Sequence, residues 1–271
     1  MNISSLQAAS IQDIVSCLLE AFKDYFVPMP SDIDYWEARY RHARVNYEQS
    51  WGVFEDGSLK GFVVNGLGES LGIPTAFNTG TGIVETHRGR QLVDRMYAAG
   101  IPGLIEQGIR QCKLEVIDQN KRAIRVYERI GFQLGQQLKC YKGEVISKRK
   151  TKCLDRTIEQ LPTTQFDPTY SWDHQTPALL LAKDVYRAVE VLGPADTLEG
   201  YIIINPRNGN IAQLETNTGN WEAIFDGIGQ LANEVRIINI PEKRTELISY
   251  LTHQGFNNTI NQYDMHMPLQ D

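Results

Sequence analysis

The chain has 271 residues, with 27 lysines and arginines against 33 aspartates and glutamates, and therefore a formal net charge of −6 at pH 7. Nothing in this acidic balance indicates nucleic acid, and we expect no nucleic-acid partner. Hydrophobic residues at 42% and charged residues at 22% are ordinary globular values, and the length favours two domains over one.

The residues from Ile11 to Phe22 are typical of an amphipathic helix. Apolar residues between Ile11 and Phe22 recur on one helical face. Asp13 and Glu20 interrupt the run, which does not fit a signal peptide. No apolar stretch in the sequence is long enough to span a bilayer, and the four cysteines show no metal-binding spacing. We expect a cytoplasmic protein with no membrane partner and no metal.

Turn signals divide the next stretch into a helix and three strands. Asp56-Gly57 is a strong hairpin signal between two apolar runs. Gly80 and Gly82 lie near the end of the third strand, where glycine often marks a bulge or a close approach. The expected elements are an aromatic and proline-rich turn over 24–30, a helix over about 35–47, and strands over 52–54, 59–67 and 74–84.

A possible anion site follows the third strand. The sequence GIVETHRGRQLVDRMY predicts a strand, a short turn and a helix whose first turn carries Arg88 and Arg90 on either side of Gly89. A helix N-terminus has unpaired N–H groups, and two guanidinium groups beside it favour a di-anion such as a pyrophosphate. Glycine and proline over 100–103 should kink or break this helix.

A second strand–helix unit follows at once. The stretch QCKLEVIDQNKRAIRVYERIGF predicts a strand, then a helix that begins near Asn120, presents Tyr127 and ends at Gly131-Phe132. An Asn and a Tyr at these places could serve a group carried on the far end of a bound pyrophosphate. The purely structural alternative is that Tyr127 is only a packed aromatic residue.

These two motifs resemble those of the GNAT family, the acyl-CoA-dependent N-acetyltransferases. Residues 88–93, RGRQLV, resemble the family's R-x-x-G-x-G/A pattern, from which Gln91 and Val93 depart. The stretch from Asn120 through Tyr127 to Phe132 matches N-x-x-A-x-x-x-Y-x-x-x-G-F throughout. The resemblance implies an α/β fold (α+β in some schemes), with a mixed, mostly antiparallel central sheet flanked by helices. It also implies a splay beside the strand over 74–84, into which the pantetheine arm inserts.

The resemblance assigns roles to individual residues. Tyr127 would be the general acid for the departing thiolate, and Asn120 would bind the pantetheine amides. Main-chain groups of Ile83 and Val84 would contact the pantetheine and polarise the thioester carbonyl. The base is less defined, with Glu115 and Glu69 as the acids to consider. Residues implied in cofactor binding are Ile83, Val84, Arg88, Gly89, Arg90, Gln91, Leu92, Val93 and Asn120, and those implied in an acceptor pocket are Tyr25, Phe26 and Pro28.

The second half of the chain repeats the first in degenerate form. LKGFVVN at 59–65 recurs as LEGYIIIN at 198–205, and Gly131-Phe132 recurs as Gly255-Phe256 in the same order. We therefore expect two tandem GNAT-like copies: a GNAT domain over 1–146, a linker over 147–165 and a degenerate copy over 166–271. The second copy has no arginines matching 88 and 90, and Leu251 stands where Tyr127 is expected. Its expected role is to complete the acceptor pocket or to form a homodimer contact.

Two functions stay open at this point. The first is an acetyl-CoA-dependent N-acetyltransferase acting on a small-molecule or protein amine by direct attack. The second is an acyl-CoA-binding or interaction pseudoenzyme without turnover, in which Gln91 and Val93 disturb the pyrophosphate cradle. No charge pattern in the first two helices selects an acceptor.

Overall fold

The chain folds into two compact units, seen in a computed structural model that describes residues 1–270. Unit 1 comprises Met1–Gly135 and the C-terminal segment from Asp264, and unit 2 comprises Gln136–Tyr263. The boundary therefore falls earlier than 146. The linker expected over 147–165 is wrong as well, because it contains strand β7 (Lys152–Arg156), the 3-10 helix η2 (Ile158–Gln160) and the start of helix α5.

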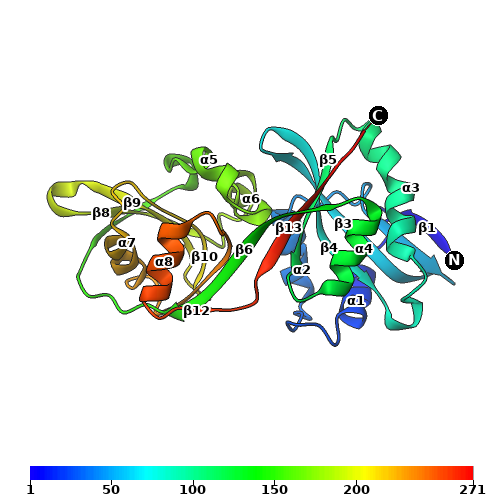
Figure 1. Ribbon diagram of the computed structural model, residues 1–271, viewed down its shortest axis with the longest axis horizontal. Helices are drawn as coiled ribbons and strands as arrows, with labels where there is room; N and C mark the ends of the chain where they lie inside the picture. The colour runs from blue at the N-terminus through cyan, green and yellow to red at the C-terminus, as the bar shows by residue number, and fades with distance from the viewer. Residues whose placement is uncertain (271) are drawn as a thin grey trace. The chain divides into compact units, whose positions relative to one another are not determined.

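The sheet of unit 1 has the strand order β1-β2-β3-β4-β5-β13. Strands β1 to β4 pair antiparallel in sequence, and β4 and β5 are parallel. Figure 1 labels most of these elements. They are β1 (Asn2–Ser5), α1 (Ile11–Ala21), α2 (Ile33–His42), β2 (Trp51–Glu55), β3 (Ser58–Ser70), β4 (Ile73–Ile83), η1 (Glu85–His87), α3 (Leu92–Glu106), β5 (Gln111–Ile117), α4 (Lys121–Ile130) and β13 (Gln262–Pro268).

Unit 2 repeats this topology with the strand order β7-β8-β9-β10-β11-β6. Here too β10 and β11 form the parallel pair, and the pairs before them are antiparallel. The prediction of two tandem copies is confirmed. The elements are β6 (Gln133–Glu144), β7, η2, α5 (Thr163–Phe166), η3 (Asp167–Thr169), η4 (Trp172–His174), α6 (Thr176–Leu181), β8 (Arg187–Leu192), η5 (Pro194–Asp196), β9 (Leu198–Asn205), β10 (Asn210–Thr216), α7 (Trp221–Ile228), β11 (Glu234–Pro241), α8 (Thr245–His253) and β12 (Asn257–Asn258).

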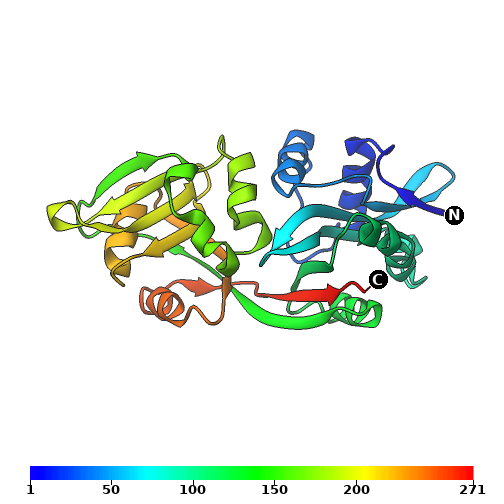
Figure 2. The same ribbon diagram turned by 90° about the horizontal axis from the view of Figure 1, so that it is seen from above.

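Each sheet takes its last strand from the other half of the sequence. Strand β6, which follows α4, pairs with β11 in unit 2, and β13, which follows α8, lies next to β5 in unit 1. Figure 2 shows β13 in red, ending at the C-terminus among elements of unit 1. Unit 1 is therefore complete only when the C-terminal strand is present.

A β-bulge at the same register position makes the two sheets comparable residue by residue. In β4 the extra residue is Thr79, between the pairs Asn65–Asn78 and Val64–Gly80. In β10 it is Ala212, between the pairs Ile204–Ile211 and Ile203–Gln213. Counting on from the bulges, Thr81 corresponds to Leu214, Gly82 to Glu215 and Ile83 to Thr216.

The parallel pair separates beyond the bulge in both units. Strand β4 pairs with β5 only from Thr75 to Asn78, although β4 continues to Ile83. Strand β10 pairs with β11 only at Asn210 and Ile211. The splay implied by the family resemblance is therefore present, and it exposes one edge of β4 to whatever lies between the strands.

Helix α1 covers this part of the first sheet. Ser10 caps it by accepting a hydrogen bond from the Asp13 N–H. Ile14 and Leu18 pack with Phe62 of β3 in one buried cluster. Burial of such side chains stabilises the fold by about 1.5–3 kcal/mol each.

Three expectations about local structure have clear outcomes. The Asp56-Gly57 hairpin is confirmed, and both residues have the positive φ that a tight two-residue turn requires. Helix α2 ends at His42 rather than near 47. The expected break near 100–103 is wrong, because α3 runs through Pro102 to Glu106. Gly100 instead makes room for a neighbour, since a Cβ there would lie 1.8 Å from the Trp51 ring.

Candidate active site

Unit 1 contains a cavity of about 590 Å³ at the splayed end of β4. Its walls come from the end of α1, the end of β4, the loop before α3 and one face of α4. Lining residues used below are Asp24, Tyr25, Phe26, Thr81, Gly82, Ile83, Arg88, Gly89, Gln91, Leu92, Val93, Asp94, Asn120, Arg122, Arg125, Tyr127 and Arg129. The cavity therefore gathers the residues of both sequence motifs.

Tyr127 reaches this cavity from α4. Its side chain is 9% exposed, and burial raises the pKa of its phenol above the ordinary value. Hydrogen bonds from Thr81 and Asn78 act in the opposite direction on that pKa. Both ends of the helix that carries Tyr127 are fixed, because Asn120 caps its start and Gly131 ends it in the left-handed conformation.

Asn120 has a structural role in addition to its place in the cavity wall. Its Oδ1 accepts the N–H of Ala123 at 3.1 Å, and its side chain also hydrogen-bonds to the Tyr25 hydroxyl, which lowers the pKa of that phenol against the larger raising effect of burial. Tyr25 packs edge-on against Phe26, with ring centroids 5.2 Å apart. Asn120 therefore links the α4 helix start to the aromatic loop after α1.

The two arginines of the first motif lie before helix α3, not in its first turn. Arg88 lines the cavity while donating to the carbonyls of Ile83 at 3.2 Å and Ala21 at 2.8 Å. Arg90 is exposed, donates to the Thr86 carbonyl at 3.1 Å and is not among the lining residues. The structure thus brings Arg88 to the site and leaves Arg90 outside it.

The start of α3 forms the adjoining wall. Gln91 precedes the helix in a left-handed conformation with φ 54°, and its side chain makes no capping hydrogen bond. The first turn therefore lacks the side-chain acceptor that an Asn, Asp, Ser or Thr at the N-cap would supply. A left-handed non-glycine residue is strained, whereas Gly89, with φ 79°, adopts this region freely.

The main chain at the end of β4 has fewer groups available to a ligand than expected. The Val84 N–H donates to the Lys60 carbonyl at 3.0 Å, and the Val84 carbonyl accepts from the His87 N–H at 2.9 Å. Val84 is 1% exposed and does not line the cavity. Both main-chain groups of Val84 are thus used within the fold, whereas Ile83 lines the cavity, and cofactor binding by Val84 stays a prediction.

Two other predicted residues lie away from the cavity. Glu115, the proposed base on β5, and Pro28, proposed for the acceptor pocket, are not among the lining residues. Successive side chains of β5 point to opposite faces of the sheet. A position on the strand that precedes Asn120 therefore does not by itself place Glu115 in the cavity wall. Of the three acceptor-pocket residues, Tyr25 and Phe26 contribute to the wall.

The cavity has an excess of positive charge. Its lining includes Arg88, Arg122, Arg125 and Arg129 against Asp24 and Asp94. Arg129 and Asp94 form a bidentate pair at 2.6 and 2.7 Å, which lowers the pKa of the Asp94 carboxyl. That pair leaves three arginines facing one free carboxylate, which favours an anionic ligand.

Sequence reasoning missed a buried polar cluster behind Tyr127. Asn78 donates to the Thr81 hydroxyl at 2.7 Å and to the Tyr97 hydroxyl at 2.9 Å. Asn78 is 6% exposed and Tyr97 is 1% exposed. The signal in the sequence was the polar run Asn78-Thr79 with Thr81 inside an otherwise buried strand, because buried polar side chains need partners.

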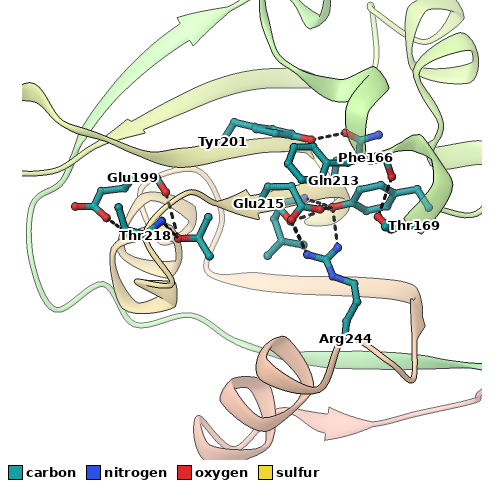
Figure 3. A network of polar contacts seen from close by, with 11 residues as sticks. Phe166, Thr169, Glu199, Tyr201, Gln213, Glu215, Thr218 and Arg244 are labelled. Carbon is teal, nitrogen blue, oxygen red and sulfur yellow. Dashed lines mark hydrogen bonds and ion pairs between the residues drawn. The ribbon is translucent and has the colours of Figure 1, made fainter.

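The same place in unit 2 is filled by side chains. Glu215, which corresponds to Gly82, pairs with Arg244 at 2.9 Å, and their side chains are 10% and 14% exposed. Arg244 stands at the N-cap position of α8, the position that Asn120 has in α4, but its side chain makes no capping hydrogen bond. Figure 3 shows Arg244 reaching from α8 toward Glu215 on β10. The Tyr170 hydroxyl joins them, donating to Glu215 at 2.6 Å and accepting from Arg244 at 3.0 Å.

This network also uses the free edge of β10. The Leu214 N–H donates to the Tyr170 hydroxyl at 3.0 Å, and the Leu214 carbonyl accepts from Arg244 at 3.3 Å. Leu214 corresponds to Thr81, beyond the point where β10 leaves β11. In unit 2, therefore, side chains of the unit itself satisfy the strand edge that a bound ligand would meet.

Within residues 1–270, no group of three or more His, Cys, Asp or Glu side chains is arranged to hold a metal ion. No helix in that range combines the length and apolar character needed to cross a membrane.

Comparison with solved structures shows the fold of the whole chain. A tandem GNAT protein from the clavulanic acid biosynthesis pathway aligns with 100% of this chain and 99% of its own, at 11% identity and TM-score 0.72. GCN5-related N-acetyltransferases from Sphaerobacter thermophilus (10% identity, 100% of this chain and 96% of that one, TM-score 0.72) and Anabaena variabilis (15%, 99% and 73%, TM-score 0.67) align as well. No curated protein matches the chain.

Comparison with family models identifies the first unit directly. The model described as the acetyltransferase (GNAT) family matches residues 15–132. That range contains the cavity and both motifs, and the tandem arrangement follows from the repeated sheet topology. Residues 15–132 of unit 1 thus match the GNAT family model, and the chain as a whole has the fold of tandem GNAT proteins.

Proposed function

We propose that unit 1 transfers the acetyl group of acetyl-CoA to a primary amine by direct attack, with Tyr127 as the general acid. The observation that carries this proposal is the position of the Tyr127 phenol, which lies in the wall of the same cavity as the start of α3 and the splayed edge of β4. The neutral phenol is the form that can donate a proton, and burial favours that form.

The cavity suits the chemical parts of acetyl-CoA. The first turn of α3, with Arg88 beside it, offers N–H groups and positive charge to a pyrophosphate. Arg122 and Arg125 add charge on the α4 side. The unpaired edge of β4 suits an extended amide chain, because such a chain can add to a strand edge.

The chemistry requires an amine with a free lone pair. Its nitrogen attacks the thioester carbonyl, the carbon–sulfur bond breaks, and the sulfur takes a proton from Tyr127. A lysine-like amine with a pKa of about 10.4 is mostly protonated at pH 7, and removing its proton costs about 4–5 kcal/mol. Because Asp94 is held by Arg129, Asp24 is the lining carboxylate left to attract a cationic amine.

We propose that unit 2 does not bind acyl-CoA. Its equivalent of the unit 1 site holds the Glu215–Arg244 pair and Tyr170, and Leu251 replaces Tyr127. Its side chains fill the place of the site, so we expect its role to be structural. Completion of the acceptor pocket and homodimer contact remain the two proposals for any further role.

The test is an activity measurement on the full-length chain. Free thiol released from acetyl-CoA would be followed with spermidine, kanamycin, lysine and a peptide with a free N-terminus as acceptors. Tyr127→Phe should lower turnover by about 100-fold or more while leaving acetyl-CoA affinity nearly unchanged. An unchanged rate would remove Tyr127 from the chemistry.

One observation supports the alternative of a pseudoenzyme that binds acyl-CoA without turnover. The strained Gln91 stands where the family motif has glycine, at the start of the helix that would hold the pyrophosphate. Acetyl-CoA binding with no acetylation of any acceptor in the panel would favour this alternative.

A further inference from the structure

The unit 1 cavity has basic and aromatic residues on different parts of its wall. Arg88 comes from the loop before α3, and Arg122 and Arg125 come from α4. The chain that joins α1 to α2 (Figure 1) contributes residues 22 and 24–26, which are three aromatic residues and Asp24. An anion is attracted to the arginines and repelled by Asp24. The wall formed by this chain therefore suits the amine rather than the phosphates of acetyl-CoA.

Three aromatic rings form a row in this part of the wall. Phe22 lies against Phe62 of β3, with ring centroids 6.5 Å apart. Tyr25 meets Phe22 edge-on at 4.7 Å, and Phe26 meets Tyr25 edge-on at 5.2 Å. Phe62 is fully buried, whereas Phe26 is 45% exposed. The row therefore ends in a partly uncovered ring, which can take a further ring in the same edge-to-face manner.

Contacts with the end of β4 and the loop after it fix the start of this row. Arg88 donates to the Ala21 carbonyl at 2.8 Å, and Lys23 forms an ion pair with Glu85 at 2.6 Å. Arg88 and Glu85 both lie in the chain between β4 and α3. A Cβ at Gly82 would lie 3.0 Å from the Ala21 Cβ. The end of α1 and the aromatic row after it are therefore held beside the strand edge proposed for acetyl-CoA.

The cavity wall offers a partner for one ammonium group. Its two carboxylates are Asp24 and Asp94, and Asp94 is already held by Arg129 at 2.6 and 2.7 Å. Lys23, the neighbour of Asp24 in sequence, is paired with Glu85. Within residues 1–270, Asp24 has no ion-pair partner. A second ammonium group on the same acceptor would therefore meet no unpaired carboxylate in this wall.

We infer that unit 1 acetylates a primary amine with one ammonium group and an aromatic body, such as 2-phenylethylamine. The ammonium group binds at Asp24, and the ring packs on Phe26. Spermidine and kanamycin carry several ammonium groups, and ethylamine has no ring, so all three are poorer acceptors. This inference rests on the proposed function, in which the free amine attacks the acetyl thioester.

The reaction step is the same for this acceptor. The ammonium group releases one proton to water, and the nitrogen of the free amine forms a bond with the acetyl carbon while the carbon–sulfur bond breaks. The sulfur takes a proton from Tyr127 and leaves as the thiol. The second proton lost by the nitrogen replaces the one that Tyr127 gave, so the products are the N-acetyl amine and CoA.

The first test compares three amines on the full-length chain with acetyl-CoA. They are 2-phenylethylamine, ethylamine, which lacks the ring, and spermidine, which carries additional ammonium groups. Values of kcat/KM are taken per free amine, because the ring also changes the pKa of the nitrogen. We expect kcat/KM for 2-phenylethylamine to exceed the other two by about 10-fold or more, since an aromatic contact adds to the burial of the ring.

Two variants separate the role of the ring from that of the charge. Phe26→Ala should lower the ratio of kcat/KM between 2-phenylethylamine and ethylamine by about 10-fold. Asp24→Asn should lower kcat/KM for both amines by about 5-fold and leave their ratio unchanged, because both carry the ammonium group. Val27→Ala is the matched control, since Val27 is 39% exposed and is not among the lining residues. Its ratio should equal that of the wild type.

Four results would overturn the inference and leave the proposed function in place. They are a kcat/KM for ethylamine or spermidine that equals or exceeds that for 2-phenylethylamine, an unchanged ratio in Phe26→Ala, an equal fall of the ratio in Val27→Ala, and full activity in Asp24→Asn. Acetylation of none of the amines would instead overturn the proposed function.

A second readout separates the two failures without turnover. With CoA in place of acetyl-CoA no acetyl group can be transferred, and saturation-transfer NMR reports whether the ring protons of 2-phenylethylamine contact the protein. The signal should appear with the wild type and Val27→Ala and be lost in Phe26→Ala. Ring contact without any acetylation would overturn the proposed function alone. Absence of ring contact in the wild type would overturn the inferred acceptor.

Discussion

Gly82 and Glu215 occupy the same register position in the two sheets, opposite Phe62 in unit 1 and Tyr201 in unit 2. In unit 1 the absence of a side chain leaves room, and a Cβ at Gly82 would lie 2.8 Å from the Phe62 ring. In unit 2 the carboxylate at this place binds Arg244. The residue at this position thus differs between unit 1, which has an open cavity, and unit 2, which has a closed polar network.

The closed network predicts a characteristic pattern of stability. Burial raises the pKa of the Glu215 carboxyl despite the opposing effect of Arg244, so removal from water outweighs the attraction of the pair. Arg244→Met should lower the free energy of unfolding by about 3–5 kcal/mol, because it leaves a buried carboxylate without its partner. Urea unfolding would measure this change.

The matched double variant Glu215→Leu with Arg244→Met should recover most of that loss, since an apolar pair of similar volume needs no partner charge. A double variant as unstable as Arg244→Met alone would show that Tyr170 and the Leu214 main chain, and not the ion pair, determine the stability of this region.

The strained helix start predicts that Gln91→Gly stabilises the protein. Gln91 has φ 54° before α3, a conformation that glycine adopts without steric strain. We expect a gain of about 1 kcal/mol in the free energy of unfolding and tighter binding of acetyl-CoA. The opposite change, Gly89→Ala, should cost about 1 kcal/mol, because its φ of 79° remains unfavourable although nothing lies within 4 Å of the added Cβ. Thermal unfolding would measure the stability of both variants. A Gln91→Gly variant that is less stable than the wild type would contradict the inferred strain at Gln91.

Arg88 and Arg90 predict different effects on cofactor binding. Arg88 lines the cavity and Arg90 does not, so Arg88→Ala should weaken acetyl-CoA binding by about 10-fold or more, as expected for loss of a charge-assisted contact. The Arg90→Ala variant should bind acetyl-CoA with nearly the affinity of the wild type. Calorimetric titration of both variants would decide, and equal affinities would remove Arg88 from the site.

The raised pKa of Tyr127 predicts the pH profile. For a lysine side chain as acceptor, kcat/KM should rise about tenfold per pH unit between pH 7 and 9, following the free amine. Because burial raises the pKa of Tyr127, its protonated form persists beyond pH 10, and the general acid imposes no fall within that range. A falling limb between pH 7 and 9 would mean that the acid has a lowered pKa and is not Tyr127.

The sequence predicted best the features that depend on local signals. Helix α4 begins and ends where Asn120 and Gly131 indicate, because capping depends on residues within one turn. The hairpin at Asp56-Gly57 follows the same rule. The exchange of β6 and β13 between the units could not be predicted, because both strands follow the same local pattern and their pairing is decided by distant residues.

Two of the predicted site residues lie outside the cavity wall for a similar reason. The family resemblance implies Val84 in cofactor binding, but the hydrogen bonds of Val84 to Lys60 and His87 appear only in the folded chain. Arg90 was assigned from the motif, but helix α3 begins two residues later, and its guanidinium contacts the main chain of Thr86. Main-chain hydrogen bonding of this kind has no sequence signature.

The most direct test of the account is calorimetric titration of the full-length protein with acetyl-CoA. The account predicts saturable binding of one acetyl-CoA per chain, abolished or weakened by Arg88→Ala and unaffected by Glu215→Leu with Arg244→Met. Binding of two per chain would show that unit 2 has an open site. No binding at all would contradict the proposed cofactor site in unit 1.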